Sequence, residues 1–164
     1  MTNLTLTKYQ PGGLATLCAL QSEYYAREWG FDHRYEAVVS RNMSEFLDRY
    51  NPDRDFVQLV LQNRVVKGGI VIDSMDGQIA QLHWFILHAD LRGSGMGSRL
   101  VTNAMTFVRE KGYPKVSLST FQGLDAARYL YEKSGFILTE EKEAATWGRS
   151  VIEQRFEWTS ALNP

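Results

Sequence analysis

The chain contains one glycine-rich turn, Arg92-Gly93-Ser94-Gly95-Met96-Gly97, directly after an apolar run over residues 82–87. A stretch with helical apolar spacing follows the turn, so the order is strand, turn and helix. Backbone N–H groups in such a turn can converge on an anion, because glycine has no Cβ to block close approach and the helix N-terminus offers unpaired donors. The sequence therefore predicts a site for a phosphate-bearing cofactor.

Two familiar phosphate-binding motifs do not fit this turn. The dinucleotide fingerprint needs a glycine at its sixth position, which counted from Gly93 is Ser98, and an acidic residue at the end of the next strand, where this chain has Ser117-Leu118-Ser119-Thr120. A P-loop needs Lys followed by Ser or Thr, and Gly97-Ser98-Arg99 lacks that pair. We therefore expect neither a nicotinamide site nor nucleotide triphosphate hydrolysis. An ordinary strand-to-helix turn is the remaining alternative.

Length and composition narrow the class of protein. At 164 residues, we expect a single domain over residues 1–164. The net charge of −1 at pH 7 predicts no nucleic-acid partner and no attraction to a membrane surface. Cys18 is the only cysteine, which excludes an internal disulfide and a multi-cysteine zinc site, and no metal site is expected. Without a signal peptide or an apolar segment of about 20 residues, we expect a cytoplasmic protein.

Hydrophobic periodicity predicts the elements that position the turn. Strands are expected at residues 4–9, 56–61, 65–72, 78–87, 116–120, 136–141 and 151–158. Helices are expected at residues 14–29, 34–49, from near 95 to 111, and 124–133. The predicted order is β, α, α, β, β, β, α, β, α, β, β, with no linker or repeat.

These motifs and this order of elements resemble the GNAT superfamily of acetyl-CoA-dependent N-acetyltransferases. Its cofactor motif, Arg/Gln-x-x-Gly-x-Gly/Ala after the fourth strand, matches Arg92 to Gly97 in full, and a second signature appears as Ala127, Tyr131 and Gly135-Phe136. Residues 81–157 are also similar to the acetyltransferase half of proteins that fuse a MarR-type DNA-binding domain to a GNAT domain. The resemblance implies an α/β fold of α+β type, whose mixed, mostly antiparallel sheet is splayed between strands 4 and 5 and carries helices on both faces.

The resemblance implies acetyl-CoA as the cofactor and CoA as a product. It assigns cofactor contacts to Arg92, Gly93, Ser94, Gly95, Met96, Gly97, Asp125 and Ala127. The pantetheine arm of the cofactor would pair with the backbone of Phe85, Ile86 and Leu87, at the open edge of the fourth strand. Many relatives have Asn at position 125, and an Asp there is less suited to a polyphosphate ligand.

Acetyl transfer to an amine needs a proton for the departing thiolate and an acceptor for the amine proton. Tyr131 matches the family's tyrosine near the cofactor sulfur, and a phenol with an ordinary pKa of about 10 stays protonated at neutral pH and can act as general acid. His83 is a candidate general base because its ordinary pKa is near 6.5. Glu153 and Glu28 compete with it, and water can relay the proton instead. The alternative for Tyr131 and His83 is a structural role.

Aromatic and acidic residues of the first two predicted helices fall where GNAT proteins usually build their acceptor pocket. The resemblance assigns Tyr25, Glu28 and Trp29 to this pocket, with Trp147 on the opposite wall. Such a mixture suits a cationic amine with apolar bulk, whereas the alternative is that the rings pack the helices together. The expected acceptor is a primary amine of a small molecule or peptide, and a homodimer is a possible assembly. A second interpretation is a CoA-binding sensor or regulatory domain without transferase activity.

Overall fold

Alternating apolar residues build the strands of one central sheet in the computed structural model, which describes residues 3–164. The strands are β1 (Leu4–Thr7), β2 (Phe56–Gln62), β3 (Val65–Asp73), β4 (Ile79–Leu87), β5 (Lys115–Phe121), β6 (Ile137–Ala144) and β7 (Val151–Thr159). Their order across the sheet is β1-β2-β3-β4-β5-β7-β6. The β4–β5 pair is parallel and the other pairs are antiparallel, so the sheet is mixed.

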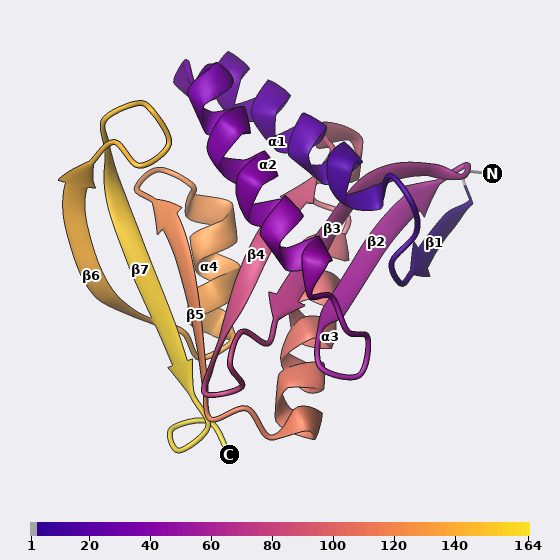
Figure 1. The fold of residues 1–164 in the computed structure, drawn as a ribbon, viewed down its shortest axis with the longest axis vertical. Coiled ribbons are helices and arrows are strands. Elements are labelled where there is room, and N and C mark those ends of the chain that lie inside the picture. The colour runs from indigo at the N-terminus through magenta and orange to yellow at the C-terminus, as the bar shows by residue number, and fades with distance from the viewer. Residues whose placement is uncertain (1–2) are drawn as a thin grey trace.

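The helices cover both faces of this sheet (Figure 1). They are α1 (Gly13–Trp29), α2 (His33–Asp48), α3 (Met96–Lys111) and α4 (Asp125–Lys133), and a short 3-10 turn, η1 (Ala89–Leu91), follows β4. Helices α1 and α2 pack on one face, and α3 and α4 pack on the other. Each face has its own apolar core, because neighbouring residues of a strand point to opposite faces. The predicted α/β fold with helices on both faces is confirmed.

The element boundaries differ from the prediction mainly at the two edges of the sheet. Strand β1 ends at Thr7 rather than at residue 9, and the ring of Tyr9 packs against Tyr50 with the centroids 5.5 Å apart. Strand β6 continues to Ala144 rather than to residue 141, because pairing with β7 extends a charged, exposed segment that has no apolar alternation. No helix within residues 3–164 combines the length and the apolar character needed to cross a membrane.

Candidate active site

Strands β4 and β5 separate after a short parallel pairing. Only three residue pairs join them, from Ile79 opposite Lys115 to Gln81 opposite Ser117. Beyond this point β5 stays paired with β7, and β4 stays paired with β3 as far as Leu87. The sheet is therefore splayed between β4 and β5, and the second half of β4 has one unpaired edge.

A β-bulge lies in the unpaired half of β4. Trp84 and Phe85 together face the single residue Ile70 of β3, and Trp84 has a left-handed φ of 52°. Side chains of a regular strand alternate between the two faces of the sheet, so residues two apart share a face. The extra residue shifts this alternation, so that side chains before and after the bulge no longer follow one pattern. Leu82 joins the core under α3 and α4, whereas Trp84 joins the core under α1 and α2. The bulge also brings the imidazole of His83 into a stack with the Trp84 ring, with the centroids 4.7 Å apart.

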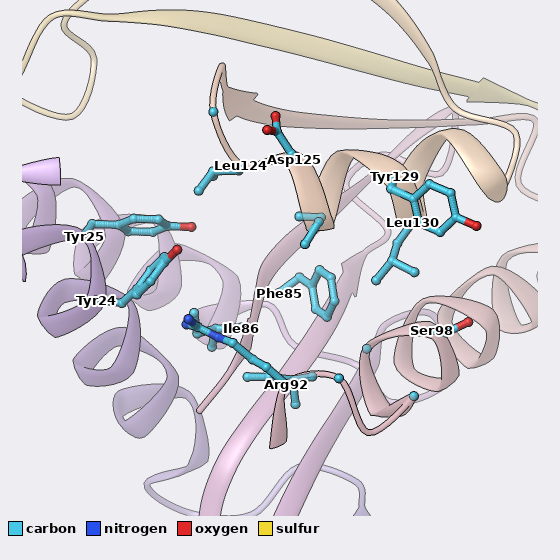
Figure 2. Close-up of a pocket in the computed structure, with 17 residues that line it drawn as sticks. Tyr24, Tyr25, Phe85, Ile86, Arg92, Ser98, Leu124, Asp125, Tyr129 and Leu130 are labelled. Carbon is cyan, nitrogen blue, oxygen red and sulfur yellow. The ribbon is translucent and has the colours of Figure 1, made fainter. Parts of the chain in front are cut away.

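A cavity of about 680 Å³ opens beside the unpaired edge of β4, and we call it the cofactor cavity (Figure 2). Its walls come from α1, β4, the glycine turn, the start of α3 and the first turns of α4. Of the residues that the sequence assigned to the cofactor, the cavity is lined by Phe85, Ile86, Leu87, Arg92, Gly93, Gly95, Gly97, Asp125 and Ala127. Ser94 and Met96 are in the same turn, but their side chains do not line the cavity.

The glycine turn has the conformation that its sequence predicts. Gly93 and Gly95 have left-handed φ angles of 73° and 82°, and a Cβ added at either would meet no atom within 4 Å. The Ser94 hydroxyl donates to the Leu91 carbonyl oxygen at 2.6 Å and accepts from the Met96 N–H at 3.3 Å, so it stabilises the turn from within. Because α3 begins at Met96, the next N–H groups of its first turn have no carbonyl partner inside the helix. The turn therefore presents free backbone donors beside the cavity.

Gly97 lets the first turn of α3 approach the floor of the cofactor cavity. A Cβ at this position would lie 3.2 Å from Leu130 Cδ1, 3.4 Å from Phe85 Cζ and 3.5 Å from Leu87 Cδ1. Three side chains from β4 and α4 thus close around the glycine. Tight packing, rather than a positive φ, disfavours a side chain at this position.

The Arg92 side chain extends away from the glycine turn. Its guanidinium lies over the Tyr24 ring of α1, 4.4 Å from the centroid, which is a cation–π contact (Figure 2). Asp125 stands on α4, at another wall of the same cavity. Among the lining residues, one side chain is thus positive and one is negative, and they lie on different walls.

A second cavity, of about 270 Å³, is lined by residues from both faces of the sheet at the gap between β4 and β5. It shares Tyr25, Phe85, Leu124 and Ala127 with the cofactor cavity, so the two spaces meet at these residues. We call it the acceptor cavity. Tyr131, His83 and Trp147 also line it, although they come from α4, β4 and the β6–β7 hairpin.

Tyr131 belongs to α4, and its side chain is buried in the core between this helix and the sheet, where it also lines the acceptor cavity. Its ring packs among Phe85, Phe136 and Phe156, with centroid distances of 6.1, 6.0 and 6.3 Å. Burial raises the pKa of its phenol well above the ordinary value, and the nearby Tyr25 raises it further. The hydroxyl therefore keeps its proton and can act as a donor.

His83 presents a neutral imidazole to the acceptor cavity. Part of its surface is open to the cavity, yet the surrounding walls remove enough water that burial lowers its pKa to about 4. The Asp73 carboxylate opposes this shift and the Arg49 guanidinium adds to it. Asp73 and Arg49 form a two-pronged ion pair with N–O distances of 2.5 and 2.6 Å, so their effects on His83 partly cancel.

The other predicted site residues lie outside the acceptor cavity. Glu28 and Trp29 border a separate hollow of about 610 Å³ between the end of α1 and the start of β7, and Glu28 pairs with Arg27 at 2.9 Å. The Glu153 carboxylate accepts from the N–H and hydroxyl of Thr146 at 2.8 and 2.9 Å within the β6–β7 hairpin. The structure thus brings Tyr25, His83, Tyr131 and Trp147 together, but not the acidic residues.

Several residues that line these cavities were not selected from the sequence, and two of them contact or adjoin the predicted aromatic residues. Phe121, at the end of β5, packs against Tyr25 and Trp147 and lines the acceptor cavity. Gln21 lines the same cavity from α1 and is 5% exposed. The sequence carried a signal for Gln21, because it is a polar residue within the otherwise apolar stripe of its helix.

A model of the Acetyltransferase (GNAT) family matches residues 14–136, which include the glycine turn, the bulge and Tyr131. The chain belongs to this family. An acetyltransferase of Pectobacterium atrosepticum is 27% identical over 107 residues, covering 65% of this chain and 73% of the relative. The family predicted from the two motifs is thereby confirmed.

Solved acetyltransferases share the whole fold of this GNAT chain. The crystal structure of an acetyltransferase from Streptococcus agalactiae superposes with a TM-score of 0.72 at 18% identity, covering 95% of this chain and 98% of the other. A GNAT family acetyltransferase from Elizabethkingia anophelis, crystallised with acetyl-CoA bound, gives a TM-score of 0.67 at 15% identity, covering 96% and 98%. The overall fold of this chain is thus the fold of solved GNAT acetyltransferases.

Proposed function

We propose that this chain is an N-acetyltransferase that moves the acetyl group of acetyl-CoA to a primary amine of a small molecule or peptide and releases CoA. The observation that carries the proposal is the meeting of two cavities at the gap between β4 and β5. One cavity has the free backbone donors of the glycine turn, and the other has a protonated phenol and a neutral imidazole. The two reactants of an acetyl transfer would meet at that junction.

The residues of the cofactor cavity suit acetyl-CoA. The N–H groups at the start of α3, with the helix dipole behind them, would hold the pyrophosphate, and the open glycine positions leave room for it. The unpaired edge of β4 at Phe85, Ile86 and Leu87 would pair with the amide groups of the pantetheine arm, as an added strand does. Asp125 is the one residue of this cavity that disfavours a polyphosphate.

When bound, acetyl-CoA supplies an acetyl thioester, whose carbonyl carbon accepts the amine nitrogen. A carbon–nitrogen bond forms and the carbon–sulfur bond breaks, so the reaction removes one proton from the amine nitrogen and adds one to the departing thiolate sulfur. The bulge at Trp84 interrupts the ladder with β3. A backbone N–H group of β4 left unpaired there would stabilise negative charge on the carbonyl oxygen. Tyr131 would donate the proton to the sulfur as general acid.

His83 would receive the amine proton. Because its pKa is about 4, the imidazole is neutral at physiological pH and its free nitrogen accepts a hydrogen bond from the amine. So weak a base holds the proton only briefly, and water at the mouth of the cavity would carry it away. We assign no transfer step to Glu153 or Glu28, because neither residue lines the acceptor cavity. The Glu153 carboxylate accepts hydrogen bonds from Thr146, and the Glu28 carboxylate pairs with Arg27.

The test is acetyl transfer to a panel of amines, followed by CoA release with a thiol reagent and by mass spectrometry of the product. Tyr131→Phe should lower kcat by about 10²- to 10⁴-fold, the usual contribution of a positioned acid. The KM for acetyl-CoA should stay within about threefold of wild type, because the phenol makes no phosphate contact. The matched control is Tyr9→Phe, which removes a hydroxyl outside both cavities.

Two results would contradict the proposal. An unchanged kcat in Tyr131→Phe would show that Tyr131 is not the general acid. Tight CoA binding without amine-dependent CoA release for any amine would favour the alternative, a CoA-binding sensor or regulatory domain.

A further inference from the structure

The acceptor cavity is uncharged. Among the residues that line it in the described part of the chain, none is Asp, Glu, Lys or Arg, and its one imidazole, His83, is neutral at physiological pH. Two carboxylates lie near its edge but do not line it: Asp73 is ion-paired with Arg49, and Glu153 accepts hydrogen bonds from the N–H and hydroxyl of Thr146. An ionised carboxylate, phosphate or second ammonium on the acceptor would lose its water here without gaining a countercharge.

Aromatic rings form much of the wall of this cavity. Tyr25 packs against Tyr35 and Phe121 with centroid distances of 5.2 and 5.4 Å, and Phe121 packs against Trp147 at 5.9 Å. Because the rings support one another, they present flat apolar faces with little freedom to move. Such faces bind a planar aromatic body by stacking, and they attract a single ammonium group through their π electrons.

Gln21 is one of several uncharged polar residues among these rings, since Asn42, Gln81, Ser119, Thr120 and Thr146 also line the cavity. Its side chain is buried, at 5% exposed, and its Oε1 atom has no hydrogen-bond partner among residues 3–164. A buried acceptor without a partner is rare in folded proteins, because burial removes the water that would otherwise satisfy it. Gln21 lies about one helical turn before Tyr25, which lines both cavities.

We propose that the acceptor is a small aromatic monoamine whose ring carries a hydrogen-bond donor, and that Gln21 Oε1 accepts from that donor. This inference rests on the proposed acetyl transfer. The uncharged lining selects against acceptors with a second charge, the rings select an aromatic body, and Gln21 selects a ring hydroxyl or N–H. The volume of about 270 Å³ lies just below the range of about 300 to 1,000 Å³ typical of drug-sized ligands, so the acceptor is small.

The experiment compares four amines at saturating acetyl-CoA: tyramine, 2-phenylethylamine, L-tyrosine and spermidine. The first two differ only in the ring hydroxyl, and tyramine differs from tyrosine only in the carboxylate. We expect kcat/KM for tyramine to exceed that for each of the others by at least about tenfold. The order of kcat/KM for these four amines with the wild-type protein tests the proposal without any variant.

Gln21→Met keeps the size of the side chain and removes the acceptor atom. It should abolish the preference for tyramine over 2-phenylethylamine by raising the KM for tyramine, without changing the KM for acetyl-CoA. Gln78→Met, at an exposed glutamine in the β3–β4 turn, is the matched control. A merely structural role for Gln21 would change both amines alike, and that result would overturn the inference.

The outcomes separate this inference from the proposed function. Faster acetylation of spermidine, tyrosine or 2-phenylethylamine than of tyramine would overturn the inference and leave acetyl transfer established. Failure to acetylate any amine of the wider panel, despite CoA binding, would overturn the proposed function itself and the inference with it.

Discussion

Gly95 and Gly112 lie at the two ends of α3 and form a matched pair for testing the phosphate turn. Their φ angles are 82° and 72°, and a Cβ added at either would meet nothing within 4 Å. A left-handed conformation costs a residue with a side chain about 1 to 2 kcal/mol. Gly95→Ala and Gly112→Ala should therefore lower Tm by similar amounts, about 2 to 8 °C for a chain of this length.

The two substitutions should differ in their effect on CoA binding. In the proposed complex, the methyl group of Gly95→Ala would project towards the pyrophosphate, so we expect the loss of at least one charge-assisted hydrogen bond. Such a bond contributes about 1.5 to 3 kcal/mol, which corresponds to an increase in Kd of about 10- to 150-fold. Gly112 lies about 25 Å away along the helix, and its substitution should change Kd by less than about twofold.

Isothermal titration of CoA into the wild type and both variants, with thermal unfolding of the apoproteins, measures the two effects separately. Equal weakening of CoA binding in both variants would mean that strain in α3, rather than the turn, controls affinity. A wild-type Kd for Gly95→Ala would refute the assignment of the pyrophosphate to this turn.

Asp125→Asn removes a negative charge from the cofactor cavity and should lower the Kd of CoA about two- to fivefold at low ionic strength, whereas an unchanged Kd would place the carboxylate beyond reach of the phosphates. Arg49→Met leaves the buried Asp73 carboxylate without its two-pronged partner and should lower the free energy of unfolding by about 2 to 3 kcal/mol in urea titrations. A loss below about 1 kcal/mol would contradict that reasoning. The pKa of His83 is about 4 in the folded chain against 6.5 ordinarily, so the unfolded state takes up the proton first and stability falls as pH drops from 6.5 towards 4. His83→Phe should remove roughly 1 to 3 kcal/mol of that decline, and parallel stability curves for variant and wild type would show that the histidine does not contribute.

The glycine turn could be predicted from the sequence because its conformation depends on residues that are consecutive in the chain. Six consecutive residues decide whether a backbone can take left-handed φ angles and expose N–H groups at a helix start, and the structure has that conformation from Gly93 to Met96. The helices and most strands were predictable for the same reason, since their periodicity is contained in each segment. Together with the second signature at Tyr131, these local features identified the family.

The acceptor cavity could not be predicted in this way, because it depends on contacts between distant segments. A one-residue bulge at Trp84 decides which face His83 occupies, and nothing in the local pattern of β4 marks that bulge. The family resemblance assigned Glu28 and Trp29 to the acceptor pocket together with Tyr25, yet the end of α1 places them at a different hollow. The sequence by itself determined the fold and the conformation of the glycine turn. Only the tertiary structure decided that the acceptor cavity is aromatic and uncharged, because that property depends on which side chains the splayed strands bring together.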